Sequence, residues 1–519
     1  MATRHDVGFV SRASIPDDQR LFVIRRDFSG GVNNRLHSSR IGENQAEVLD
    51  NWDIGIPGEI HKRPGYSAIA NDVGADSPVI LHNYEIQGTA AQFLMYEDTH
   101  LHKWTGTGNW ASLKANFTAS TDVGIITCKM SGITPDDIVI VQNGTEAFAF
   151  KSDGTPLDLI DEKTHKPTLT TVMAWYGNRV WLLKNDLLYF SDAYPADYGE
   201  AFNTTPFRLP VGEERALLAT RDFGIIVCGK NAIWAINPSP SPVATDQIEP
   251  LLTNIGVVSK KGAIIGGDDI YFFSQDGFRA LKRTGLDKLQ MGADYPISYK
   301  LKTEFERISW ANISKLSMEY FDNKIFISVP TGAATFDLWV YYPVNDSFAI
   351  VRDADVSCWG KFKVSGEERL YAGEVGDGVV NHFWTGLNDS GTAIEADFVG
   401  REEDFQQPLI KKVGGEVEIE ASSAGGEFAL SVYAAFDGKS FEQLGTLALD
   451  EGDAPTLPID LPFDLADRYV VRKKFPIDKY GAFRTIQIKV VNEELNTDPV
   501  ILYAYQVVTF PEEYQEKET

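Results

Sequence analysis

The chain is poor in cysteine, in long apolar runs and in positive charge, and each shortage narrows what the protein can be. Its 519 residues include three cysteines, Cys128, Cys228 and Cys358, each within an apolar, strand-like run. An odd number at wide spacing supports neither a disulfide framework nor a cysteine-based zinc site, so we interpret them as small buried hydrophobes. No stretch approaches the length of apolar sequence that a membrane-spanning helix needs. The first residues are basic without the apolar core of a secretory signal, so we expect synthesis in the cytoplasm.

The shortage of positive charge is marked: 48 Lys and Arg stand against 74 Asp and Glu, a formal net charge of −26. Affinity for nucleic acid comes mainly from basic side chains that displace counterions from phosphates, so this balance disfavours tight DNA binding. It does not disfavour DNA that merely passes close by. The ordinary interpretation of such acidity is solubility.

Sequence motifs for catalysis and for cofactors are also missing. No GxGxxG or GxxxxGK[ST] stretch follows an expected strand, and there is no HExxH or GxSxG. His100 and His102 flank Leu101 on one strand face and could bind a metal together, but without a third ligand an exposed pair explains them better. The SQDGFR stretch at 274–279 faintly resembles the aspartate turn of sialidase blades, yet a hairpin turn explains it fully. We therefore expect no enzyme, no cofactor and no metal site.

What the sequence does contain is a hairpin that recurs at intervals of about 45 residues. Each unit has a β-branched or aromatic strand, a polar or glycine-containing turn, and a second strand that ends in an aromatic residue such as Tyr189 or Trp234. The units lie near Phe93, Ile138, Val180, Ile225, Ile270, Ile325 and Leu370. A single hairpin cannot bury both of its faces, whereas hairpins stacked radially bury them and leave few free edges.

The even spacing predicts a mainly β protein with a β-propeller of six to eight blades. The alternative is an ordinary series of hairpins in two stacked sandwiches. After about residue 386 the pattern becomes clean alternation, with Val417 and Ile419 on one face and glutamates between them, which predicts an antiparallel β-sandwich. Helix is scarce, and only 42–52 and 297–311 have helical spacing. The expected organisation is an N-terminal arm and platform segment (1–75), a β-propeller (76–386), a β-sandwich (387–510) and a flexible tail (511–519).

One N-terminal stretch, residues 27–66, combines a Gly-Gly-x-Asn turn, an Asn-Gln-Ala segment and a Lys-Arg-Pro-Gly close. This order of motifs resembles the N-terminal signature of the podophage tail nozzle, or tail tubular protein B, family of tailed bacteriophages and of the related packaged-DNA stabilisation proteins. Two later stretches, 175–198 and 256–281, are similar to blades of the same families. The matching signature residues are Gly30, Gly31, Asn33, Asn44, Gln45, Ala46, Asn51, Gly58, Lys62, Arg63, Pro64 and Gly65.

What the resemblance implies is a structural virion protein at the distal end of a short tail. Identical copies, six by this resemblance, would form a ring that continues the DNA channel, retains packaged DNA and guides genome ejection. The implied partners are further copies of the chain, tail adaptor or connector proteins, tail fibres or a spike, and DNA that passes through the lumen without specific binding. The protein would be made in the host cytoplasm and located in the virion tail.

We expect the signature segment to form a platform between subunits, because its glycines permit tight turns and its proline fixes one. The residues expected to shape that platform are Gly30, Gly31, Asn33, Asn44, Gln45, Asn51, Arg63, Pro64 and Gly65. The alternative is a segment that only caps the propeller. Two other functions stay open: a receptor- or carbohydrate-binding tail module such as a fibre or spike adaptor, and a glycan-cleaving propeller enzyme. The enzyme would need a carboxylate pair with arginine partners in one pocket.

Overall fold

The structure, a computed structural model, shows a mainly β chain that divides into two compact units. Unit 1 contains Met1–Arg63 and Ala393–Thr519, and unit 2 contains Pro64–Thr392. No helix in the described part of the chain is both long and apolar enough to cross a membrane. The described residues are 20–86, 90–131, 137–157, 169–193, 202, 206–238, 247–283, 289–291, 295–352, 354–423, 428–449, 469–496 and 498–512.

The described residues of unit 2 contain six four-stranded antiparallel sheets, and strands β28 to β31 pair with one another in the same antiparallel way. The seven sets of four strands are numbered below as sheets in chain order. The strands of the first three sheets are β8 Pro78–Tyr84, β9 Gln92–Glu97, β10 His100–Trp104, β11 Ala111–Lys114, β12 Gly124–Lys129, β13 Asp137–Gln142, β14 Ala147–Phe150, β15 Pro156–Leu157, β16 Met173–Tyr176, β17 Arg179–Lys184, β18 Leu187–Phe190 and β19 Phe207–Arg208. Those of the next three are β20 Glu214–Thr220, β21 Gly224–Gly229, β22 Ile233–Asn237, β23 Gln247–Leu252, β24 Ala263–Gly266, β25 Asp269–Ser274, β26 Gly277–Arg283, β27 Leu289–Met291, β28 Ser317–Phe321, β29 Lys324–Pro330, β30 Phe336–Tyr342 and β31 Ser347–Val351. The seventh contains β32 Val356–Val364, β33 Glu367–Glu374, β34 Val380–Phe383 and β7 Tyr66–Ala68.

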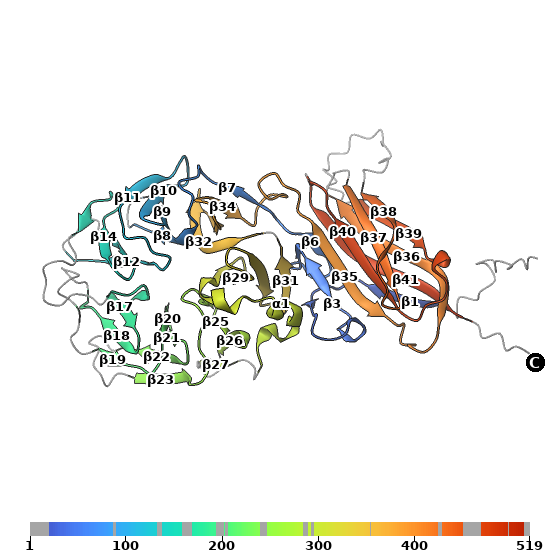
Figure 1. Cartoon of the computed structure of the whole chain (residues 1–519), viewed down its shortest axis with the longest axis horizontal. Coiled ribbons are helices and arrows are strands. Elements are labelled where there is room, and N and C mark those ends of the chain that lie inside the picture. Colours follow the sequence, from blue (N-terminus) through green and yellow to red (C-terminus); the bar gives the residue numbers. More distant parts are fainter. Residues whose placement is uncertain are drawn as a thin grey trace, which may run out of the picture. The chain divides into compact units, whose positions relative to one another are not determined.

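The first strands of these sheets succeed one another around a closed circle (Figure 1). β8 contacts β12, and the contacts continue through β16, β20, β24 and β28 to β32, which contacts β8 again. The seventh sheet is completed by β7, a strand that precedes the first sheet in the chain and pairs antiparallel with β34. Because the circle closes, every sheet has a neighbour on each face.

Apolar side chains fill the spaces between neighbouring sheets. Buried clusters are shared by the first and second, second and third, third and fourth, and fourth and fifth sheets. Aromatic pairs join β25 to β30 and β29 to β32. At the closing interface, the ring centroid of Phe93 in the first sheet lies 5.3 Å from that of Phe362 and 5.0 Å from that of Tyr371 in the seventh. Each such side chain contributes about 2 kcal/mol when it is fully buried.

All three cysteines are free and buried in these sheets. Burial raises the pKa of Cys228 to about 12, so its thiol stays protonated and unreactive at neutral pH. The interpretation of the cysteines as small buried hydrophobes is confirmed.

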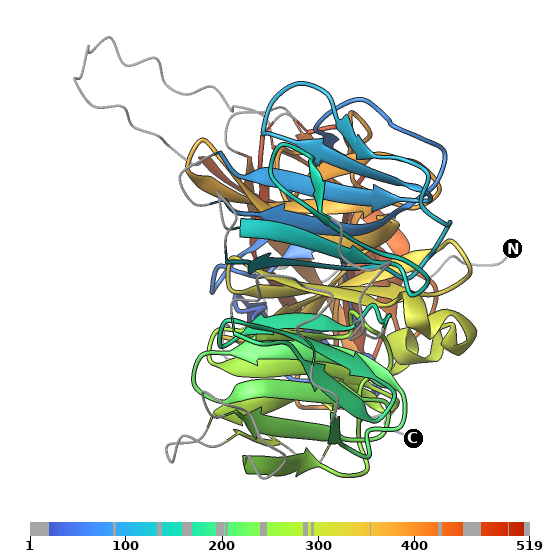
Figure 2. The same cartoon turned by 90° about the vertical axis from the view of Figure 1, so that its left-hand side faces the viewer.

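The helical segment of unit 2 lies outside the sheets, between β27 and β28 (Figure 2). The continuous helix expected over 297–311 is replaced by three short turns, η4 Ile297–Lys300, α1 Lys302–Glu306 and η5 Trp310–Lys315. Leu301 interrupts the first two with a backbone outside the helical region, at φ −93° and ψ 60°. A bond from the Ser309 amide to the Pro330 carbonyl (2.8 Å) then draws the chain toward β29. Trp310 consequently stays 40% exposed.

Unit 1 contains two larger antiparallel sheets and a small parallel pair. Its N-terminal elements are β1 Leu21–Arg25, β2 Gly31–Val32, η3 Ser38–Arg40, β3 Gln45–Ala46, β4 Val48–Asp50, β5 Trp52–Asp53 and β6 Ile60–Lys62. Its C-terminal elements are β35 Ala396–Glu403, β36 Lys412–Ser423, β37 Phe428–Phe436, β38 Glu442–Leu449, β39 Tyr469–Pro476, η6 Asp478–Tyr480, β40 Ile486–Asn492 and β41 Val500–Pro511. One sheet has the order β39-β36-β41-β6-β5, with β1 also paired to β41, and the other has the order β4-β35-β40-β37-β38.

The two sheets of unit 1 share apolar contacts, for example between Phe398 of β35 and Tyr505 of β41, whose ring centroids are 6.0 Å apart. Along β36, Val417 and Ile419 are fully buried, while the glutamates that alternate with them, Glu416, Glu418 and Glu420, are half-buried. This is the predicted alternation. One of those glutamates, Glu416, lies 2.6 Å from the Lys474 ammonium of the neighbouring strand β39.

The helix predicted over 42–52 is wrong, because this segment forms the short strands β3, β4 and β5. Ala46, Leu49 and Trp52 are buried at the spacing of three that suggested a helix. Two bends that separate three very short strands also bury every third residue, so they give the same spacing as a helix. Pairing of β3 with β2 and of β4 with β35 supplies backbone hydrogen bonds from distant residues, and such tertiary pairing overrides a weak local preference.

The N-terminal segment expected as one body (1–75) contributes strands to both units. Strands β1 to β6 belong to unit 1, and β7 belongs to unit 2. Of the expected C-terminal tail (511–519), only Pro511 and Glu512 are among the described residues, and Pro511 ends β41.

We predict that Tyr66→Ala weakens the closure of the sheet circle. The Tyr66 ring stacks on Phe383 with centroids 5.6 Å apart, so its removal should cost about 1–3 kcal/mol in the free energy of unfolding. The measurement is urea unfolding of the full-length protein, with Ser67→Ala as control because Ser67 is an exposed neighbour on the same strand. Equal stability of the two variants would contradict the role given to β7.

Candidate functional site in the signature segment

The first half of the signature segment forms one hydrogen-bonded cluster in unit 1. The Gly30 amide donates to the Asn44 carbonyl (2.9 Å), and Gly31 pairs with Gln45 in the parallel β2–β3 bridge. The Gln45 side-chain oxygen accepts from Asn33 Nδ2 at 2.8 Å and from the Gly42 amide at 2.7 Å. The structure therefore brings together five of the predicted residues, which lie in two stretches of the chain about a dozen positions apart.

Position 30 has no room for a side chain, so it must be glycine. A Cβ at this position would lie 2.7 Å from Asn44 Oδ1 and from Gln45 Cγ, closer than real side chains approach. Gly31 is required by conformation, because its φ of 61° lies in the left-handed region. The two glycines allow the strands before and after the loop 34–43 to meet.

A second cluster joins Asn51 and Arg63 at the open end of the β5–β6 hairpin. Asn51 has a φ of 61°, and its side-chain amide donates to the Glu395 carbonyl at 2.6 Å. Its Oδ1 accepts from Arg63 Nε at 2.8 Å, and its carbonyl accepts from the Arg63 amide at 3.0 Å. Arg63 is only 1% exposed. An isolated buried guanidinium would be costly, so these bonds are part of what allows it to be buried.

Pro64 and Gly65 belong to unit 2 and contact a different part of the chain. The Gly65 carbonyl accepts from the Thr385 amide at 2.9 Å, and its own amide donates to the Gly386 carbonyl at 3.3 Å. A Cβ on Gly65 would overlap the carbonyl of Asn388. Gly65 thus permits close backbone packing immediately before β7.

An ion-pair cluster near the signature segment was missed from the sequence. Arg25 of β1 makes two hydrogen bonds to the Glu403 carboxylate, at 2.7 and 2.9 Å, and lies 3.1 Å from Glu43. Arg401 donates to the backbone carbonyls of Ser39 and Ile41 at 3.0 and 3.2 Å. Apart from the pair of Arg25 with Glu43, these contacts join residues 360 to 378 positions apart. The only local signal was that Arg25 ends an alternating strand.

A carboxylate pair with arginine partners does occur in unit 2, as a glycan-cleaving enzyme would require. Arg352 Nη1 lies 2.9 Å from Glu304 of α1 and 2.9 Å from Asp337 of β30, and Arg307 Nε lies 2.9 Å from Asp337. Both carboxylates are 5% exposed. Because each is buried against a guanidinium, we interpret this network as a link between the helical segment and the sixth sheet.

The SQDGFR stretch forms a hairpin turn between β25 and β26, as expected. Asp276 accepts from Ser274 Oγ at 2.5 Å and from Arg279 Nε at 3.0 Å, and Arg279 is 4% exposed. The Asp276 carboxylate therefore holds the turn together.

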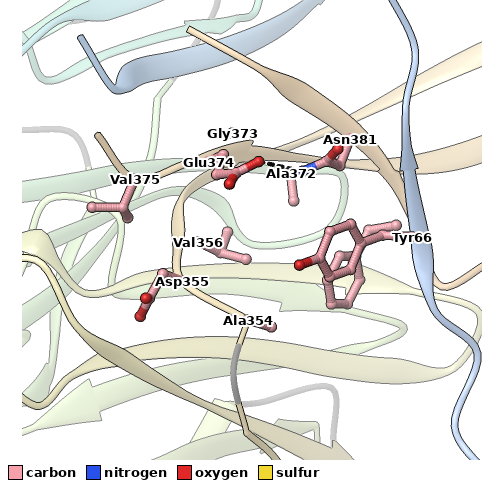
Figure 3. A pocket seen from close by; sticks show the side chains of 10 residues that line it. Tyr66, Ala354, Asp355, Val356, Ala372, Gly373, Glu374, Val375 and Asn381 are labelled. Carbon is pink, nitrogen blue, oxygen red and sulfur yellow. Dashed lines mark hydrogen bonds between the residues drawn. The ribbon is translucent and has the colours of Figure 1, made fainter. Parts of the chain in front are cut away.

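A pocket of about 120 Å³ lies within unit 2, lined by residues of the seventh sheet and by residues 354–355, which precede β32 (Figure 3). Glu374 accepts from Asn381 Nδ2 at 3.1 Å, and Asp355 accepts from the Phe336 amide at 2.6 Å. Figure 3 shows the Asp355 carboxylate turned away from that of Glu374, with the Tyr66 ring on the other side of the pocket. The two carboxylates do not converge as the pair of a glycosidase does.

Comparison with known proteins gives no family. No protein-family model and no curated protein matches the chain. The extracellular domain of a hybrid two-component system from B. thetaiotaomicron is 14% identical over 62% of this chain and 40% of that chain, with a TM-score of 0.43. An exo-β-1,3-galactanase from Phanerochaete chrysosporium is 7% identical over 86% of this chain and 99% of that chain, with a TM-score of 0.28. An ancestral GH74 enzyme is 9% identical over 74% and 54%, with a TM-score of 0.34.

The chain thus spans 40% of the length of the first of these structures. At such TM-scores and identities the likeness carries no argument about function.

We predict that Asn51→Ala lowers the free energy of unfolding by about 3 kcal/mol, because it removes two buried hydrogen bonds and puts a Cβ-bearing residue without local side-chain bonding in the left-handed region. Asn51→Gly should recover about 1 kcal/mol of this loss, since glycine tolerates the conformation. Urea unfolding of the full-length variants measures both effects.

The matched control is Asn178→Ala, at an exposed turn position that also has a φ of 61°. It isolates the backbone effect, which should be about 1 kcal/mol. An Asn51→Ala loss no larger than that of the control would show that the Asn51–Arg63 contact does not stabilise unit 1.

Proposed function

We propose that the protein is a structural component of a short phage tail, of the tail nozzle or packaged-DNA stabilisation kind. Copies of the chain assemble into a ring, six in number, that continues the DNA channel, retains packaged DNA and guides its ejection. Its partners in the virion are tail adaptor or connector proteins, fibres or a spike, and DNA in transit. The protein works mechanically and catalyses no reaction.

The observation that carries this proposal is the structural role of the signature residues. They are the residues on which the resemblance depends, and they act as backbone and side-chain contacts that build both units. The segment supplies strands β4, β5 and β6 to the sheets of unit 1 and strand β7 to the seventh sheet of unit 2. A motif that shapes an architecture, with Arg63 and Asn51 buried, fits a structural part better than a binding pocket.

The finer description of the fold belongs to the same proposal. We take unit 2 as a β-propeller of seven blades, on the strength of its circle of four-stranded sheets closed by β7. We take unit 1 as a β-sandwich, supported by the apolar contacts between its two sheets. Closed and mutually covered sheets suit a component that must hold its shape under mechanical load.

The charge of the chain is compatible with a DNA conduit. A net charge of −26 per copy repels the phosphate backbone at close range, over roughly a Debye length of about 8 Å at physiological salt. DNA that moves past acidic walls does not adhere to them. A chain that bound the duplex tightly would instead need clusters of Lys and Arg.

We place the contact between neighbouring copies on the exposed loop that the first signature cluster holds. The side chains of Asn33, Asn51 and Arg63 are buried inside unit 1 and cannot reach a partner. The loop between β2 and β3 is accessible, however, and it exposes Leu36 by 50%. Buried glycines and amides thus fix the loop, and its outer residues meet the next subunit.

We predict that the purified, untagged full-length protein forms rings, alone or with the tail adaptor protein of the same phage. The expected mass of a ring is six times 57.6 kDa, about 346 kDa, with a central hole by negative-stain microscopy. Mass photometry gives the stoichiometry. A protein that stays monomeric with and without adaptor, and never joins a tail complex, would contradict the proposal.

The site of the subunit contact is tested by Leu36→Asp, which places a charge in the proposed interface and should reduce the fraction of chains in rings at least tenfold. The control is Leu495→Asp, because Leu495 is 52% exposed in the same unit outside the signature segment. If wild type assembles and Leu36→Asp assembles equally well, the ring proposal stands and the loop is not the contact.

A further inference from the structure

Lys62 is a residue of the signature segment that belongs to neither of its two clusters. It ends β6 and is 6% exposed, and its side chain lies on the same face of the strand as that of the fully buried Ile60. Asn492 ends β40 in the other sheet of unit 1 and is 1% exposed, on the same face as the fully buried Val490. An amine and an amide therefore meet between the two sheets, although 430 positions of the chain separate them.

The Lys62 amine lies very close to the Asn492 amide. Lys62 Nζ is 2.5 Å from Asn492 Oδ1, whereas N–H···O hydrogen bonds are ordinarily about 2.7–3.2 Å long. Because a C=O bond is about 1.2 Å long, Nζ lies at most about 3.7 Å from Cγ of the amide. Atoms that are about to react are held roughly 3–3.5 Å apart. The Glu494 carbonyl accepts from the same amine at 3.0 Å and helps to keep it there.

Two neighbours hold the Asn492 amide in the orientation that attack on its carbon requires. Asn496 Nδ2 donates to Asn492 Oδ1 at 3.1 Å, so this oxygen accepts from a second donor besides Lys62. Donors at a carbonyl oxygen stabilise the negative charge that develops there when a nucleophile attacks the carbon. Asn492 Nδ2 donates to the Ala429 carbonyl at 3.0 Å, which fixes the nitrogen as the group that faces away from the amine.

A carboxylate lies on the side of the amide nitrogen. The Ala429 amide donates to Glu494 Oε2 at 2.6 Å, and the N–H and C=O groups of one residue point to the same side of an extended strand. The Glu494 carboxylate and Asn492 Nδ2 are therefore both held on one side of Ala429. Because Glu494 is exposed, its carboxylate can also exchange protons with water.

We propose that Lys62 and Asn492 form a covalent amide bond in the folded protein. Lys62 Nζ bonds to Asn492 Cγ, and the bond from Cγ to Nδ2 breaks. Two of the three protons of the Lys62 ammonium pass to the departing nitrogen, with the Glu494 carboxylate as their carrier, and this nitrogen leaves as an ammonium ion. The products are one amide and one ammonium ion, so atoms and charge balance without an oxidant, a reductant or a cofactor.

The bond joins the two stretches of chain from which unit 1 is built. Lys62 belongs to the stretch Met1–Arg63 and Asn492 to the stretch Ala393–Thr519. A covalent cross-link between distant positions stabilises a fold mainly by restricting the unfolded chain, as a disulfide does. The inference depends on contacts within unit 1 alone, so it does not rest on the proposed function.

The test is the mass of the untagged full-length protein under denaturing conditions, which remove every non-covalent contact. Compared with Lys62→Arg, and after correction for the substitution, we expect the wild type to be lighter by about 17 Da, the mass of one ammonia molecule. A tryptic digest should contain one peptide in which the segment with Lys62 is joined to the segment with Asn492.

An unchanged mass would overturn the proposal. A loss of about 17 Da without the joined peptide would overturn it as well, because cyclisation of an asparagine that precedes glycine, as Asn143 does, also releases ammonia.

The matched control is Lys412 in the wild-type digest. It is another fully buried lysine of unit 1, and its ammonium donates at 2.7–2.8 Å to the backbone carbonyls of Asp404, Gln407 and Arg484. A peptide carbonyl has no ammonia to release, so trypsin should cleave after Lys412 as it does after any unmodified lysine. A joined peptide at Lys412 would show that burial of a lysine, and not the Asn492 amide, decides the reaction.

The part of Glu494 is tested by Glu494→Gln, a change at an exposed position that keeps the shape of the side chain. The fraction of joined chains, followed by mass from the time of expression, should rise at least about tenfold more slowly than in the wild type. Circular dichroism checks that the variant folds. Joining at the wild-type rate would overturn the role given to this carboxylate.

Discussion

The structure of unit 2 depends on the burial of both faces of every sheet. A four-stranded sheet with two apolar faces is stable in water only when each face has a neighbour. The first and last sheets of a row would each lack one, so the row must close. Phe93 packs against Phe362 and Tyr371 at that closure, and β7 completes the last sheet with chain from before the first. Apolar packing and one long-range strand pairing therefore fix the circle together.

The signature segment lies outside the repeated hairpins, and it also contributes to the closure of unit 2. It leaves unit 1 at Arg63 and enters unit 2 at Pro64, and its polar residues hold each stretch in a defined path. Gly30 and Gly65 allow backbone approaches that no other residue permits, while Asn51 supplies a left-handed turn and satisfies a buried arginine. The motif is thus explained by packing and hydrogen bonding, which is what the proposed structural role requires of it.

The sequence predicted the repeating hairpins well, because each depends on strand propensity and turn chemistry within about 45 residues. The alternation in β36 was confirmed for the same reason. The prediction of a helix failed at 42–52, because strands far away in the chain decide the structure there. It also failed at 297–311, because the backbone of Leu301 and the hydrogen bond from the Ser309 amide interrupt the helix. The number of sheets in unit 2, expected as six to eight, could not be derived from the sequence. The strand that completes the last sheet, β7, is only three residues long and gives almost no sequence signal.

The predicted site residues are brought together in two clusters, with Pro64 and Gly65 apart from both. Their pairings could not be read from spacing alone, because Asn33 with Gln45 and Asn51 with Arg63 meet through strand register.

The central claim is that copies of this chain surround a channel, and a reconstruction of the purified particle by cryo-electron microscopy tests it most directly. We expect six copies related by a rotation axis, with an axial opening wide enough for duplex DNA and the loop that carries Leu36 at the contact between neighbours. A solitary chain with no symmetric neighbour, or a closed assembly without an axial opening, would contradict it.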